Sequence, residues 1–252
     1  MPVTAADIVW FGSTTMPSLA TPEVTENIGG AIDLTKKIIF TRLGGATLIE
    51  MLSDAAGDTT QDVTVHYLDS AGIRSSETQT LNGTSVVAFA ATMQTFLAAV
   101  MSGVGAGTIT IRKASAGATV ATLEAGITSV RLPFFDQQSD MSAIKVFHEK
   151  LFVKNIHATL ALTGAQISIA ADPQGVLTFA LEASLNGTGG NGAGNNRQVA
   201  PGGFSFDAAA KAVATGNLTA GAAQGVWLKS TLPATKAPFD SSFTMRTAGV
   251  TA

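Results

Sequence analysis

The chain has 252 residues, a formal net charge of −3 and no cysteine. Its hydrophobic content of 46% is enough to build a sizeable core, which excludes wholesale disorder. The lack of cysteine excludes disulfide scaffolds and zinc–thiolate sites. Nucleic-acid binders need clustered basic residues, and no basic run here is longer than a pair such as Lys36-Lys37. The composition therefore argues against a nucleic-acid partner.

The N-terminal residues predict an extended arm over residues 1–35. Turns are expected at Pro17, at Pro22 and at Gly29-Gly30, and Trp10 and Phe11 form a short apolar pair. The first residues lack the basic and apolar regions of a signal peptide, so we expect synthesis in the cytosol without export.

A first β-rich domain is predicted over residues 36–140. After strand-like runs at 37–43 and 46–52, residues 63–67 alternate with period two, a turn follows at 69–72, and 73–81 returns as the second strand of a hairpin. A second hairpin is expected from 108–112 and 119–123. Residues 133–140 read as a hinge that closes this domain.

Residues 86–101 predict one short helix inside this domain. Apolar residues recur there at helical spacing, which indicates one buried or interface face: Phe89, Met93, Phe96, Leu97 and Val100. Thr92 and Gln94 interrupt the run, and a membrane-spanning helix needs about 20 apolar residues. We therefore expect no membrane segment.

A second domain, a β-sandwich, is predicted over residues 141–252. Its strand-like runs are 143–148, 151–157, 159–161, 165–170, 176–184, 225–232 and 242–250. A long loop at 185–203 has almost no apolar content. Short strands at regular spacing predict a mainly β fold of two β-sandwich-like domains.

No residue constellation predicts catalysis, a cofactor or a metal. The histidines, His66, His148 and His157, are scattered, and His148-Glu149-Lys150 reads as a charged boundary between two strands. The glycine-rich segment 103–107 follows the expected helix, the reverse of the order in phosphate-binding loops. A hydrolase remains an alternative only if distant carboxylates meet in space; the least implausible set is Asp136, Asp140 and Glu149.

The low charge of the chain predicts a surface that is covered in an assembly. Charged residues make up 13% of the chain, whereas soluble domains average about 25%. Interfaces disfavour charges that must be desolvated, so we expect a homo-oligomer or attachment to a lattice. The expected contacts are the arm and the loops at 185–203 and 233–241, with the candidate residues Trp10, Phe11, Pro17, Pro22, Asn186, Asn191, Arg197, Pro201, Pro238 and Phe239.

The order of several segments resembles structural proteins of tailed-bacteriophage virions. The resemblance is carried by low-specificity turn patterns, chiefly DTTQDVTVHYLDSAGIRSSETQTLNGT, EKLFVKNIHATLAL and ADPQGVLTFALEASLN. It brings no catalytic residues. It implies a non-enzymatic decoration or cement protein that binds the major capsid protein, other virion proteins and itself, located in the virion after synthesis in the host cytoplasm.

Two alternatives stay open beside the capsid role. A neck, tail or baseplate protein would use the same sandwich parts. A receptor- or carbohydrate-binding module would need exposed aromatic side chains, and Trp10 and Trp227 lie in apolar, strand-like contexts instead.

Overall fold

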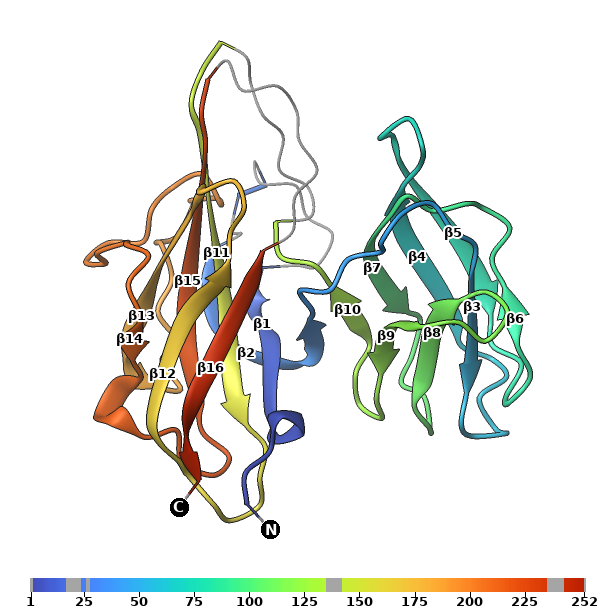
Figure 1. Cartoon of the computed structure of the whole chain (residues 1–252), viewed down its shortest axis with the longest axis horizontal. Coiled ribbons are helices and arrows are strands. Elements are labelled where there is room, and N and C mark those ends of the chain that lie inside the picture. The colour runs from blue at the N-terminus through green and yellow to red at the C-terminus, as the bar shows by residue number, and fades with distance from the viewer. Residues whose placement is uncertain (1, 17–23, 26–27, 135–141, 235–242, 252) are drawn as a thin grey trace. The chain divides into compact units, whose positions relative to one another are not determined.

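The computed structural model describes residues 2–16, 24–25, 28–134, 142–234 and 243–251. Within these ranges the chain is mainly β, which confirms the predicted fold class, and its only helical elements are the 3₁₀ turns η1 (Ala5–Asp7) and η2 (Ala214–Gly216). The strands are β1 (Ile8–Thr15), β2 (Gly29–Ile38), β3 (Ile49–Ser53), β4 (Asp62–Leu68), β5 (Arg74–Thr80), β6 (Val87–Ala88), β7 (Thr95–Met101), β8 (Ile109–Lys113), β9 (Thr119–Leu123), β10 (Ser129–Arg131), β11 (Lys145–Asn155), β12 (Leu162–Ala171), β13 (Leu177–Leu185), β14 (Lys211–Ala212), β15 (Ala223–Leu232) and β16 (Thr244–Thr251). Figure 1 labels them.

The chain folds as two compact units that divide the sequence unevenly. Unit 1 comprises Met1–Asp33 and Asp136–Ala252, and unit 2 comprises Leu34–Phe135. The sequence analysis expected a middle domain at 36–140 and a separate arm before it. The residues of that arm up to Asp33 instead belong to unit 1, so unit 2 is inserted in the sequence of unit 1.

Unit 1 contains two sheets. In the larger one the strand order is β13-β15-β11-β1, followed by the first half of β2; the smaller one has the order β14-β12-β16. Lys211 of β14 lies 5.5 Å from the ring centroid of Phe179 on β13, so the smaller sheet covers part of the larger. Ala165 and Ile167 of β12 and Met245 of β16 are buried on the inner face. The core of unit 1 therefore lies between two sheets.

Strand β1 corrects the expectation of an extended N-terminal arm. Ile8 pairs with Asn155 and Phe11 with Phe152 in an antiparallel ladder, so β1 is an inner strand of the larger sheet. Trp10 and Phe11 are buried in unit 1. The apolar pair that suggested contacts with a neighbour is satisfied inside the unit, because an inner strand is covered on both faces.

Unit 2 also contains two sheets. One has the order β5-β4-β7-β10, next to the second half of β2, and the other has the order β6-β3-β8-β9. Both hairpins predicted from the sequence, β4–β5 and β8–β9, are present as antiparallel pairs. The alternating residues Val63 and Val65 of β4 and Ile109 and Ile111 of β8 are fully buried.

The helix expected at 86–101 is absent, and that prediction is wrong. The segment contains the short β6, a turn and β7. Strand β7 pairs with β4 on one side and β10 on the other, and Thr95–Ala99 are all buried. An inner strand covered on both faces reads as a continuous apolar run, which period alone does not distinguish from a buried helix.

The described part of the chain holds no helix of the length and apolarity needed to cross a membrane.

Candidate functional site

Strand β11 carries three consecutive ionisable residues, His148, Glu149 and Lys150, and all three are buried. The sequence analysis placed a strand boundary there, which is wrong, because β11 runs without interruption from Lys145 to Asn155. Successive side chains of a strand point to opposite faces. Lys150 therefore lies on one face of the sheet with His148, and Glu149 lies on the other.

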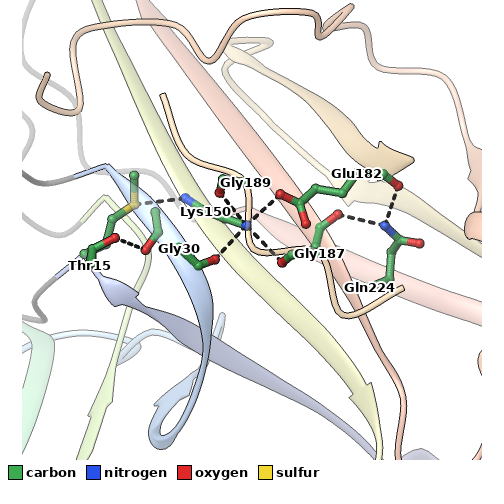
Figure 2. Close-up of polar contacts among 10 residues, drawn as sticks. Thr15, Gly30, Lys150, Glu182, Gly187, Gly189 and Gln224 are labelled. Carbon is green, nitrogen blue, oxygen red and sulfur yellow. Dashed lines mark hydrogen bonds and ion pairs between the residues drawn. The ribbon is translucent and has the colours of Figure 1, made fainter. Parts of the chain in front are cut away.

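The ammonium of Lys150 is enclosed by oxygen atoms from three separate segments (Figure 2). Its Nζ donates to the carbonyls of Gly30, Gly187 and Gly189 at 2.7, 3.2 and 2.6 Å. It also lies 2.6 Å from Oε1 of Glu182 in an ion pair whose side chains are 0% and 6% exposed. We call Lys150, Glu182 and these three glycines the lysine cage. The cage joins β2, β11, β13 and the loop after β13.

Glycine is required where the cage approaches its charged groups. A Cβ on Gly29 (φ +103°) would lie 3.0 Å from both Lys150 and Trp227. A Cβ on Gly225 would lie 2.6 Å from Oε2 of Glu182. The Gly29-Gly30 pair, which the sequence analysis read as a turn, begins strand β2, and its lack of side chains makes room for the lysine.

The surroundings of Lys150 keep its amine occupied as a donor. An ammonium has three N–H groups and no acceptor, and the cage offers four oxygen atoms. The rings of Phe152 and Trp227 lie 4.9 and 5.9 Å from Nζ. Burial lowers the pKa of Lys150 from its ordinary value, and the hydrogen bond and charge of Glu182 oppose that shift. This arrangement fastens loops and strands together and leaves no lone pair free for nucleophilic attack.

The loop at 185–203, expected to be an exposed tip, folds partly inward and closes this site. The backbone N–H of His148 donates to the carbonyl of Arg197 at 2.6 Å, and Arg197 lies 3.7 Å from the carboxylate of Glu149. Asn191 is buried and donates to the carbonyls of Asn196 and Val199. The loop therefore has internal partners of its own, and the expectation that it waits for a neighbouring subunit is wrong for Asn191 and Arg197.

His148 is neutral and packed against an aromatic ring. Its imidazole meets Phe206 edge-on with centroids 5.5 Å apart. Burial is the main cause that lowers the pKa of His148 from 6.5 to about 4. His157 accepts backbone hydrogen bonds from Thr159 and Leu160, and His66 belongs to unit 2. The structure does not bring His148 and His157 into one constellation, since each has its own local packing or bonding role.

Carboxylates in unit 2 also serve as loop anchors. Asp58, 1% exposed, accepts from the Ser53 hydroxyl at 2.6 Å and from the backbone N–H groups of Ala106 and Gly107 at 2.8 and 3.1 Å. These bonds, with that of Ser53 the largest cause, lower the pKa of Asp58. In the glycine-rich segment 103–107, a carboxylate of the chain itself therefore binds two of the N–H groups that would be needed to bind a phosphate.

Two further carboxylates of unit 2 also hold a loop by accepting hydrogen bonds from its backbone. Glu77 accepts from the backbone of Ala90 and Ala91 at 2.8 and 2.9 Å. Glu50 accepts from Ser115 and Ala116 at 3.1 and 3.0 Å and from Arg112 at 2.7 Å. Ser115 and Ala116 have φ values of 61° and 56°, and Glu50 holds this left-handed turn in place.

The remaining candidate residues lie in different settings. Asn186 is exposed and exchanges hydrogen bonds with Ala223, while Pro201 is buried. Several candidates lie outside the described residues: Pro17, Pro22, Pro238, Phe239, Asp136 and Asp140. Glu149, the third member of the hydrolase set, is buried beside Arg197. Among the described residues, no group of three His, Asp or Glu side chains is arranged to hold a metal ion.

Sequence reasoning missed Lys150 and Glu182, although a signal was present. The segment VFHEKLFVKN contains no glycine, proline or other turn residue before Asn155, which favours one strand over two. Glu182 is likewise the only charge in the apolar strand LTFALEASL. The lone carboxylate of Glu182 in an apolar strand predicts a buried cationic partner, since an unpaired buried charge is costly, but β11 offers several lysines and the sequence does not select Lys150 among them.

The fold and this site define a mainly β protein in which ionisable side chains fasten loops to sheets. No known protein-family profile matches the chain, and no curated protein matches it significantly in sequence.

Proposed function

We propose that this chain is a non-enzymatic structural protein of a tailed-bacteriophage particle, which binds the capsid shell and stabilises it as a decoration or cement protein. The observation that carries the proposal is the structural use of its ionisable groups. Lys150 and Glu182 form the lysine cage, and Asp58, Glu50 and Glu77 anchor loops. A body whose charged groups hold its own loops in place suits a protein that works by shape and contact.

The surface supports the same proposal. Among the described residues, ten large hydrophobic side chains are exposed and come from both units, including Ile73, Ile144 and Val250 at 61, 64 and 70%. With charges at only 13% of the chain, such a surface loses little on desolvation when covered. Contacts of modest size then add up when they are repeated around a lattice.

The carbohydrate-binding alternative receives less support from the tryptophans. Sugar stacking needs an exposed aromatic face, and Trp10 and Trp227 are 9% and 0% exposed. A neck, tail or baseplate location uses the same two-sheet units and differs in copy number, so it is the second candidate.

The test is the copy number of the chain in purified particles, measured by quantitative mass spectrometry against the most abundant shell protein. A ratio near one, or a simple lattice fraction, supports decoration or cement. About six to twelve copies per particle, as in a closed ring, would instead support a location in the neck or tail. Absence of the chain from particles would reject the virion role in any form.

A further inference from the structure

Strand β16 is an open edge of the smaller sheet in unit 1. The sheet has the order β14-β12-β16, so β16 pairs with β12 on one side only. No backbone hydrogen bond joins its other side to any described residue. An open edge presents a row of N–H and C=O groups that another strand can pair with.

Two other sheet edges among the described residues are blunted, and β16 is not. On β13, Phe179 exchanges backbone hydrogen bonds with Asp207, which covers part of that edge. The edge strand β5 is polar and carries Arg74 and Glu77. Strand β16 reads TMRTAGVT, with Arg246 as its only charge and no proline. At 70%, its Val250 is the most exposed large hydrophobic side chain in the described chain.

The alternation of β16 determines which of its residues would meet a partner strand on the outer face. Ile167 of β12, which is buried, pairs with Thr247, and the exposed Gln166 pairs with Ala248. Since side chains alternate, Arg246, Ala248 and Val250 share the outer face. An added strand would lie beside these three side chains.

We propose that β16 pairs in antiparallel fashion with β16 of a second copy of this chain, about a twofold axis at Ala248. In this register Ala248 faces its own copy, and Arg246 of each chain faces Val250 of the other. The aliphatic stem of Arg246 then covers Val250 while its guanidinium stays in water. A register centred on Arg246 would instead place two like charges directly opposite each other, which is unfavourable.

This pairing stands on the geometry of β16 and goes beyond the proposed particle role. Strand β16 would be the surface through which the chain self-associates, as its low charge suggests. One pair of eight-residue strands buries little area, so the dimer is weak and concentration-dependent. The two proposals are tested separately. The copy number in particles tests the virion role, and the oligomeric state in solution tests the pairing of β16 with a second β16.

Sedimentation velocity of the full chain over a range of concentrations tests the pairing. We expect a monomer–dimer equilibrium in the unmodified chain that is lost in Ala248→Lys, because the twofold axis brings the two introduced charges together. The matched control is Ile73→Lys, which adds the same charge at an exposed aliphatic residue between β4 and β5 of unit 2. It should dimerise as the unmodified chain does, and a dimer lost in both variants would overturn the proposal.

A crosslinking experiment tests the register itself. The chain has no cysteine, so Ala248→Cys introduces a single thiol. At the twofold axis two such thiols lie directly opposite each other, with Cβ atoms about 4.5–5.5 Å apart. A small local shift brings them to the roughly 3.5–4.5 Å that a disulfide needs. Mild oxidation should give a covalent dimer with Ala248→Cys and far less with Val250→Cys, whose opposite residue is Arg246. A monomer at every concentration, or better crosslinking at residue 250, would overturn the proposal.

Discussion

At the scale of single residues, the interior of unit 1 depends on one buried lysine. Lys150 contacts oxygen atoms of Gly30, Gly187, Gly189 and Glu182, which come from three separate parts of the chain. Even its backbone N–H is engaged, donating to the sulfur of Met16 at 3.1 Å. Removal of this one side chain therefore leaves several buried acceptors without their donor.

We expect Lys150→Met to lower the free energy of unfolding of unit 1 by about 3–5 kcal/mol, because it leaves the Glu182 carboxylate buried and uncompensated. Urea unfolding followed by tryptophan fluorescence measures this, since both tryptophans, Trp10 and Trp227, lie in unit 1. The double variant Lys150→Met with Glu182→Leu should recover part of the loss.

Lys154 provides the control for this experiment. It lies on the same strand and donates to the carbonyl of Gly221 in an exposed contact. Lys154→Met should cost about 1 kcal/mol or less. Equal stability of the variants at 150 and 154 would contradict a stabilising role of the lysine cage in unit 1.

His148 makes a separate prediction, on pH. Its pKa is 6.5 in the unfolded chain and about 4 in the fold, so between these values the unfolded state binds more protons. Stability therefore falls as the pH drops from about 6.5 to about 4, by a total of about 3 kcal/mol from this group. His148→Phe keeps a ring beside Phe206 and should flatten this part of the curve. Equal slopes for the two proteins in urea unfolding from pH 7 to pH 4.5 would contradict the assignment.

At the scale of elements, β1 is part of a core and not an appendage. It lies between β11 and the first half of β2 in the larger sheet of unit 1. Deletion of residues 2–15 should therefore unfold unit 1 and leave unit 2 intact. Hydrogen exchange by mass spectrometry should show lost protection in β11 and β15 and retained protection in β4 and β7. Full protection of β11 in the deletion variant would restore the idea of a dispensable arm.

The elements also show what the sequence can and cannot predict. The β4–β5 hairpin was predictable because β4 alternates buried and less buried residues and Asp69-Ser70-Ala71-Gly72 is strong turn chemistry. Strand β7 was not, because an inner strand loses the alternation that distinguishes it from a helix. Of the lysine cage, only Glu182 leaves a signal in the sequence, as the single charge of an apolar strand. The three glycine carbonyls of the cage come from backbone positions that no side-chain pattern reveals.

At the scale of the whole molecule, the order of the chain has a consequence for its synthesis. All of unit 2 lies before residue 136. Strand β1 pairs with β11, which is synthesised later, and the partner of Ile8 is Asn155. A chain made from its N-terminus can therefore complete unit 2 while the first strand of unit 1 is still without its main partner. Closing so long a loop is slow, and an unpaired apolar strand is prone to aggregate. The rate at which the ribosome adds residues 136–155 thus sets how long β1 stays exposed in the cell.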